Sequence, residues 1–353
     1  MLEIKSKTLD YISGGTGSFY ITGTSAVSGA FQGFIAAEDT VVSSLLDAQG
    51  NEVISVYGVG SQTLSKGAYI SAPRGQYFSS ITLTSGSVVA FYTNVAALSP
   101  VTEGAAFDSD YQAVLNYATT QTYTIPSESQ QELQNQLVVD LKDAGVWSKL
   151  DLFYVFATDG DSDFASINWK DPNNFEITEV NSPTFTTNEG FQGDGSSSYL
   201  DTNFIPSTDS TKSTSNTLSA GGYIINKATS SYDNIIGVDS GSNDILIATK
   251  FSSEQPFFRI NDSGSFRPSF TTTVGFYGVS RSSFGSTTAI LPNGTIENSD
   301  RSAASGLPSD ILTIQKWAGL YANSTVSCAF YGGNVSSELS DFKTSVDNYI
   351  TSI

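Results

Sequence analysis

The chain has 353 residues, a length that suits about two domains and allows a sizeable core. It contains 16 Lys and Arg against 35 Asp and Glu, which gives a formal net charge of −19, although only 14% of its residues are charged. Because this balance leaves no basic patch that could release phosphate counterions, nucleic acid and anionic membranes are excluded as main partners.

Residues 1–98 are predicted to form a small antiparallel β-sandwich or barrel. Short alternating segments, each bounded by turn residues, occur over 18–22, 31–37, 40–46, 52–58, 78–84 and 86–92. Strands of this length and spacing are typical of such folds. The chain begins without the apolar core and cleavage site of a signal peptide and has no long apolar run, so we expect a soluble polypeptide without membrane insertion.

Residues 99–145 are predicted to be a connector that contains one helix over 127–144. The first part, 99–126, is mixed and rich in turn residues. Ser127 and Gln130 then form a capping-box pattern, and Gly145 can supply the left-handed stop. One narrow apolar stripe follows this helix, made by Leu133, Leu137, Val138 and Leu141. We expect the stripe to pack on its own domain, with copies of itself in an oligomer as the alternative.

Residues 146–353 return to strands and are predicted to form a jelly-roll sandwich of two curved sheets. The expected strands lie at 149–157, 223–228, 234–238, 244–251, 256–262, 276–282, 287–294 and 325–333. A closing helix is expected after Ser336 or Ser337, either of which can cap it. Its apolar residues at helical spacing are Leu339, Phe342, Val346, Tyr349 and Ile350. The single cysteine, Cys328, lies in an alternating run where a small buried residue is the expected role.

The sharpest acidic cluster is DGDSDF, in which Asp159, Asp161 and Asp163 alternate as in a calcium loop. Phe164 stands where an EF-hand needs glycine, and Lys170 stands where it needs a bidentate glutamate. The segment is therefore predicted to be a plain acidic loop, and a looser calcium site at the three aspartates is the open alternative. No other cofactor is expected.

The chain has no histidine, which excludes Ser-His-Asp and Cys-His catalysis and nearly all zinc and iron ligand sets. A hydrolase would need two carboxylates that alternate along one strand, and no predicted strand carries such a run. The pairs Glu176 with Glu179 and Glu297 with Asp300 are interpreted as solvated charges. No catalytic residue is therefore proposed. The three tryptophans could bind sugars, but core packing is expected for each of Trp147, Trp169 and Trp317.

The stretch GFQGDGSSSYLDTNF, residues 190–204, places three glycines within six residues and resembles a phosphate-binding loop at first sight. Such a loop needs a lysine to meet the phosphates and a helix directly behind the glycines. Here the hydroxyl-rich run from Ser196 to Tyr199 follows, so the stretch is predicted to be a turn that enters a strand.

Two regions resemble known families. The strand pattern of residues 1–98 is similar to small domains of bacteriophage head-fibre and capsid-decoration proteins. The segments LKDAGVWSKLDLFYVFA, INWKDPNNFEITEVNSPTFTTNEGFQGDGSSSYLDTNFIPST, GVSRSS, LPNG and AFYGGNVSSELSDFKTSVDNYI resemble the concanavalin A-like, or laminin G-like, domains of bacteriophage virion proteins. This second similarity spans roughly residues 133–353. Its family includes lectins, glycan-cleaving enzymes and structural modules, so the fold alone does not select an activity.

The resemblance implies a structural protein on the exterior of a bacteriophage particle, as a head fibre, a capsid decoration or a tail-associated protein, present in the host cytoplasm during assembly. The N-terminal β-domain would attach to other virion proteins, and the jelly roll would project outward and could bind host surface polysaccharide. We expect a homotrimer, because repeated weak attachments act together. The competing classes are a glycan-cleaving enzyme of the jelly-roll kind and a bacterial lectin or adhesin.

Overall fold

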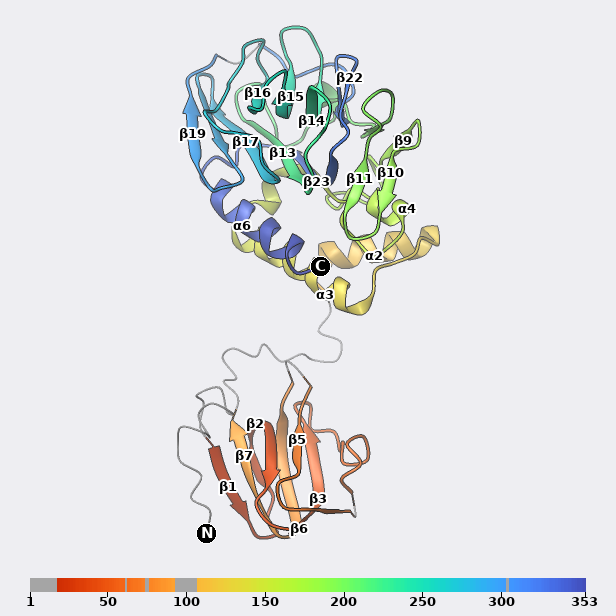
Figure 1. Ribbon diagram of the computed structural model, residues 1–353, viewed down its shortest axis with the longest axis vertical. Coiled ribbons are helices and arrows are strands. Elements are labelled where there is room, and N and C mark those ends of the chain that lie inside the picture. The colour runs from red at the N-terminus through yellow and green to blue at the C-terminus, as the bar shows by residue number, and fades with distance from the viewer. Residues whose placement is uncertain (1–17, 61, 74–75, 93–106, 303–304) are drawn as a thin grey trace. The chain divides into compact units, whose positions relative to one another are not determined.

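The computed structural model describes residues 18–60, 62–73, 76–92, 107–302 and 305–353. The chain divides into two compact units, Met1–Ala105 and Ala106–Ile353 (Figure 1). Among the described residues, no helix is both long and apolar enough to cross a membrane.

The first unit is one antiparallel sheet in the order β1-β7-β2-β6-β3-β4, with β5 paired to β2. Its strands are β1 (Ser18–Thr22), β2 (Val27–Ala36), β3 (Thr40–Asp47), β4 (Thr63–Leu64), β5 (Tyr69–Ser71), β6 (Phe78–Ser85) and β7 (Ser87–Tyr92). Strands β2, β3, β6 and β7 all contribute to one core, so the predicted small β-domain is confirmed. The apolar residues of the 31–46 region lie inside this core: Phe31, Phe34, Val42 and Leu45.

The second unit contains two packed antiparallel sheets. The larger runs β10-β11-β23-β13-β17-β18-β19, with β8 also paired to β23, and the smaller runs β16-β15-β14-β20-β12-β9. The larger sheet comprises β8 (Leu150–Val155), β10 (Thr184–Thr186), β11 (Gly190–Gln192), β13 (Leu218–Ile224), β17 (Gly275–Ser283), β18 (Ser286–Ile290), β19 (Ile296–Ser299) and β23 (Thr325–Gly332). The smaller comprises β9 (Thr178–Val180), β12 (Tyr199–Asp201), β14 (Tyr232–Val238), β15 (Ile245–Phe251), β16 (Phe257–Ile260) and β20 (Thr313–Ile314). The predicted all-β class, with a sandwich of the jelly-roll kind, is confirmed.

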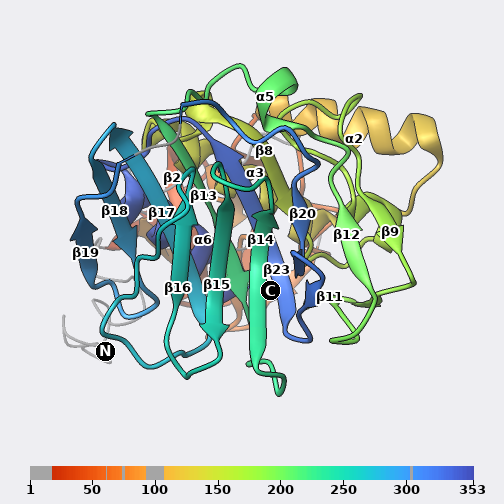
Figure 2. The ribbon, with the colours of Figure 1, turned by 90° about the horizontal axis from the view of Figure 1, so that it is seen from above.

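Helices cover the larger sheet on the side away from the smaller one, so this unit has three layers (Figure 2). They are α2 (Ser109–Gln121), α3 (Glu128–Asp143) and the closing helix α6 (Leu339–Ile350). Two short helices, α4 (Ser162–Ala165) and α5 (Pro206–Asp209), lie in connections. The predicted helices over 127–144 and at the chain end are confirmed.

The interpretation of residues 99–145 as a connector was wrong for its described part. Helix α2 occupies the segment expected to be turn-rich, and both α2 and α3 belong to the second unit. The helical spacing of the residues that α2 buries was overlooked; they are Tyr111, Val114, Leu115 and Ala118. Leu137 and Leu141 of α3 are buried in the same cluster, so the leucine stripe packs on its own unit, as expected. The homotrimer stays a prediction.

Two cores hold the second unit together. One lies between the sheets, and the other lies between the larger sheet and the helices. Phe342 of α6 is at the centre of the second core, with its ring centroid 4.5 Å from that of Phe330 and 5.3 Å from that of Phe276. Trp147, Trp169 and Cys328 are buried in this core, as predicted.

Candidate functional site

A cavity of about 360 Å³ lies where β12, the end of β14 and the segment after β19 meet. Tyr199 and Asp201 of β12 form part of its wall, together with Asp239, which directly follows β14. The remaining wall includes Asp310, Ile311, Lys316 and Trp317. We call this cavity the Tyr199–Trp317 pocket. Its wall combines aromatic rings, three carboxylates and one ammonium group.

A turn held by Asp194 positions Tyr199. The Asp194 carboxylate accepts hydrogen bonds from the backbone N–H groups of Ser196, Ser197 and Ser198 at 2.7–2.8 Å. These bonds hold the pKa of Asp194 well below its usual range. The turn connects β11 to β12, so the prediction that the glycine-rich stretch is a turn entering a strand is confirmed.

A tight hairpin positions Lys316 and Trp317. Strand β21 (Lys316–Trp317) pairs with β22 (Leu320–Tyr321) across the two residues Ala318 and Gly319. Both turn residues have positive φ, 49° and 76°, as a two-residue type I′ turn requires. Alanine is strained in this conformation, because its Cβ crowds the backbone.

Replacing Ala318 with asparagine is expected to raise the free energy of unfolding by roughly 0.5–1 kcal/mol, because asparagine tolerates the left-handed conformation better than alanine. Tryptophan fluorescence during urea unfolding can measure the change. All three tryptophans lie in the second unit, so this signal reports on that unit alone. A stability equal to or below that of the wild type would contradict the strain argument.

The Trp317 indole lies against the face of the smaller sheet that points away from the main core. A Cβ added to Gly237 of β14 would lie 3.1 Å from the indole Cδ1, so glycine at this position permits the close approach. The indole N–H donates to the carbonyl of Val238 at 3.2 Å, and the Arg259 guanidinium lies 5.1 Å from the ring centroid. Trp317 is 9% exposed, so the expectation of burial is confirmed, but in a separate outer cluster that borders the pocket.

Lys316 and Tyr199 form the other side of the pocket. The Lys316 ammonium lies 4.0 Å from the centroid of the Tyr199 ring, within the range of a cation–π interaction. The Tyr321 ring centroid lies 6.1 Å from that of Tyr199. The contact places the ammonium over one face of the Tyr199 ring, so this side of the pocket combines an aromatic ring with a hydrogen-bond donor.

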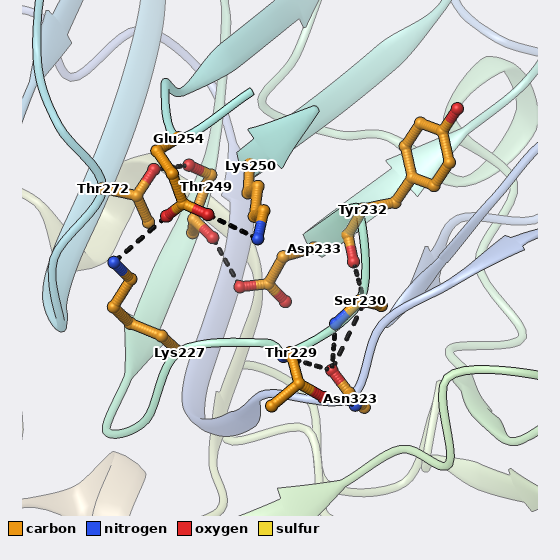
Figure 3. A network of polar contacts seen from close by, with 10 residues as sticks. All are labelled: Lys227, Thr229, Ser230, Tyr232, Asp233, Thr249, Lys250, Glu254, Thr272 and Asn323. Atoms are coloured by element: carbon orange, nitrogen blue, oxygen red, sulfur yellow. Dashed lines mark hydrogen bonds and ion pairs between the residues drawn. The ribbon is translucent and has the colours of Figure 1, made fainter. Parts of the chain in front are cut away.

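A network of polar contacts at the opposite end of β14 fixes the chain that follows the hairpin (Figure 3). The Asn323 side-chain oxygen accepts from the backbone N–H of Thr229 at 3.1 Å, and its amide donates to the Thr229 hydroxyl at 2.7 Å. The carboxylate of Asp233, which is fully buried, accepts from the hydroxyls of Thr249 and Ser324. Burial raises the pKa of Asp233. Because Asn323 and Ser324 lie two and three residues after the end of β22, this network anchors the segment that carries Trp317.

Figure 3 also shows two ion pairs, which connect three segments of the same region. Glu254, in the turn before β16, lies 2.5 Å from the Lys250 ammonium of β15 and 3.1 Å from that of Lys227. These side chains are partly exposed, so the pairs contribute little individually and serve mainly to orient the turn.

The three aspartates of the DGDSDF loop do not converge on an ion. Asp161 is the N-cap of α4, accepting from the N–H of Phe164 at 2.9 Å, and its other oxygen accepts from the N–H of Thr124 at 2.6 Å. Asp159 accepts from the N–H of Ser127 at 3.0 Å. Asp163 is exposed within α4. In the part of the chain that the structure describes, no group of three or more His, Cys, Asp or Glu residues is arranged to hold a metal ion.

The interpretation of Glu176 as a solvated charge was wrong. Its two carboxylate oxygens accept from the hydroxyls of Tyr117, at 2.8 Å, and Tyr123, at 2.7 Å. Burial and this carboxylate raise the pKa of Tyr117 to about 12. Glu176 therefore holds the end of α2 and the following turn to the sandwich, a role that a sequence separation of more than 50 residues concealed. Asp300, also interpreted as solvated, is exposed.

Comparisons with known proteins give only remote structural matches. No family model and no curated protein matches the sequence. A sialidase from Trypanosoma rangeli, bound to a difluoro-KDN ligand, matches with a TM-score of 0.40 and 10% identity, over 62% of this chain and 39% of that one. Domain 4 of a GH43 arabinanase from Geobacillus stearothermophilus, in complex with arabinotriose, matches with a TM-score of 0.35 and 10% identity, over 55% of this chain and 98% of that domain. At this level of likeness, the activities of those proteins do not transfer to this chain.

Proposed function

We propose that the second unit is a glycan-binding module that recognises a neutral or amino-sugar-containing saccharide in the Tyr199–Trp317 pocket. The observation that carries the proposal is the composition of the wall, with aromatic rings next to several carboxylates. Aromatic faces pack against the C–H surfaces of sugar rings, and carboxylate oxygens accept hydrogen bonds from sugar hydroxyls. A volume of about 360 Å³ lies within the usual range of small-ligand sites.

The charge of the pocket defines the class of glycan. Asp201, Asp239 and Asp310 outnumber the single Lys316, and the whole chain carries −19. Acidic sugars would therefore be repelled both at a distance and in the pocket. Neutral sugars avoid this cost, and an amino sugar would gain an ion pair.

We propose binding without cleavage, since the chain has no histidine and the pocket carboxylates have no strand alternation of the kind expected for a two-carboxylate hydrolase. Release of reducing ends from a bound polysaccharide by the purified chain would instead favour the glycan-cleaving alternative.

Binding is tested with a panel of neutral, amino-containing and acidic oligosaccharides, followed by titration calorimetry of the best ligand. Tyr199→Ala is expected to weaken binding at least tenfold, or ~1.4 kcal/mol, because it removes the aromatic wall. Asp310→Asn should weaken the binding of neutral sugars less than Tyr199→Ala does. It should also remove any preference for amino sugars.

Tyr232→Ala is the matched control, because Tyr232 begins β14 whereas the pocket lies at the end of that strand. It should leave the affinity unchanged. Equal losses of glycan affinity in Tyr199→Ala and Tyr232→Ala would contradict the proposed site. A preference for acidic glycans would contradict it as well.

For the biological setting, we propose that this module is displayed on the exterior of a bacteriophage particle and that the first unit attaches it. The resemblance of roughly residues 133–353 to virion domains and the acidic, histidine-free composition support this setting. A density map of the intact particle tests it. Absence of the chain from purified particles would favour the bacterial lectin or adhesin alternative.

A further inference from the structure

Asp233, the second residue of β14, carries a carboxylate that joins three other segments of the chain. The side chain is 0% exposed. Its Oδ2 accepts from the hydroxyl of Thr249 on β15 (Figure 3), and its Oδ1 accepts from the hydroxyl of Ser324, which lies in the bend between β22 and β23. The backbone N–H of Ala228 also donates to this carboxylate. One buried group therefore holds two loop segments and a strand to the start of β14.

No cation neutralises this carboxylate. Among the residues that the structure describes, no lysine or arginine forms an ion pair with Asp233. The ammonium groups of Lys250 and Lys227 face the same network, but both are paired with Glu254, at 2.5 and 3.1 Å (Figure 3). Strand β17 contributes Tyr277, and burial raises the pKa of this phenol, so it stays neutral. A buried ionised carboxylate without a paired cation is costly, so protonation is the less costly way to keep the group buried.

Burial and protonation of Asp233 are therefore linked. Burial raises the pKa of the carboxyl group, and this effect outweighs the hydroxyl donors and Lys250, which act in the opposite direction. A protonated carboxyl group can donate to one of the two hydroxyl groups, so the network keeps its bonds when it takes up a proton. The contribution to stability is complete below the pKa of the unfolded chain, and it is lost as the pH rises through the higher pKa of the folded chain.

We infer that Asp233 is a pH switch that controls how firmly the bend at Asn323 and Ser324 is held against β14. With Asp233 neutral, the bend is closed. With Asp233 ionised, the bend opens so that water reaches the carboxylate. The bend is the part that yields, because Thr249 lies within β15, which is paired with β14 and β16, whereas Ser324 lies outside the strands.

The switch reaches the Tyr199–Trp317 pocket through the chain itself. Strand β22 ends two residues before Asn323, so opening of the bend also changes the mobility of the β21–β22 hairpin and of Trp317. The inference goes beyond the proposed glycan binding and does not depend on it, because its tests need no ligand.

Asp233→Asn tests the switch, because asparagine has the same shape and stays neutral at every pH. Urea unfolding of the wild type and the variant is followed by tryptophan fluorescence from pH 4 to pH 8. The ratio of the wild-type unfolding equilibrium constant to that of the variant should rise with pH. The rise should reach up to about tenfold per pH unit between the two pKa values of Asp233, and at least about tenfold in total. Glu132→Gln, which removes an exposed carboxylate of α3, is the control and should follow the wild type at every pH.

Hydrogen–deuterium exchange locates the change. At pH 8 the amides of residues 322–325 should exchange at least about tenfold faster in the wild type than in Asp233→Asn, whereas at pH 4.5 the two proteins should exchange alike. The amides of β15 and β16 should exchange alike in both proteins at both pH values.

A stability ratio that does not change with pH would overturn the switch, and so would faster exchange spread over the whole second unit. If Asp233→Asn does not fold, the Cγ chemical shift of Asp233 in the wild type decides. A titration midpoint at least one unit above that of an exposed aspartate, about pH 3.9, supports the switch, and a lower midpoint overturns it.

Discussion

Replacing Arg281 with methionine is expected to lower the free energy of unfolding by about 3–5 kcal/mol. The side chain is fully buried, and its guanidinium donates to Asp262 and, at 2.9 Å each, to the carbonyls of Ile260 and Phe284. Methionine fills much of the same volume but leaves the Asp262 carboxylate and the carbonyls without a donor. An uncompensated buried charge is among the costliest single changes to a fold.

Urea unfolding followed by tryptophan fluorescence measures this change in the second unit. Arg267→Met is the control. Arg267 is exposed and lies over the Phe257 and Phe251 rings, at 4.4 and 5.8 Å from their centroids, so its loss should cost no more than about 1 kcal/mol. Similar losses in the two variants would show that burial of Arg281 does not determine its contribution.

Replacing Phe342 with alanine is expected to cost about 3–5 kcal/mol as well, through a different mechanism. The ring is buried between α6 and the larger sheet, and besides Phe330 and Phe276 it contacts Phe153, with centroids 6.2 Å apart. Its removal leaves a cavity under a helix that cannot move closer without disturbing these rings.

The same unfolding measurement serves here, with Phe284→Ala as the control. Phe284 is 58% exposed, so this change should alter the stability by less than about 0.5 kcal/mol. A loss below about 1.5 kcal/mol in Phe342→Ala would indicate that the second unit does not depend on α6.

Local sequence signals were sufficient for α3 and α6, because the apolar stripe of each helix lies within its own segment. The expected caps were wrong: Ser127 makes no side-chain cap hydrogen bond, and the N-cap of α6 is Glu338 rather than Ser336 or Ser337.

Local signals were also sufficient for the turn at Asp194, where the hydroxyl-rich run itself supplies the donors. Helix α2 was overlooked because its buried residues alternate with Asn, Thr and Gln in a segment that also resembles a loop. Glu176 binds partners far along the chain, and Asp161 binds Thr124 as well as its local partner Phe164, so both carboxylates were interpreted as surface charge.

The candidate site was beyond sequence reasoning for the same reason. Tyr199, Asp239 and Asp310 come from segments separated by 40 residues or more, and only the pairing of β12 and β14 with β20 brings them together. The one sequence signal that could have indicated this site was the Ala318-Gly319 pair between two short apolar segments. It marks a tight hairpin and thereby the exposed end of the sheet near Trp317.

The most direct test of the proposed glycan-binding function is a crystal structure of the chain with its tightest-binding neutral oligosaccharide. A sugar ring packed against Tyr199, with hydroxyls within hydrogen-bond distance of Asp239 or Asp310, is the predicted result. A glycan bound only at surfaces away from the Tyr199–Trp317 pocket would contradict the account.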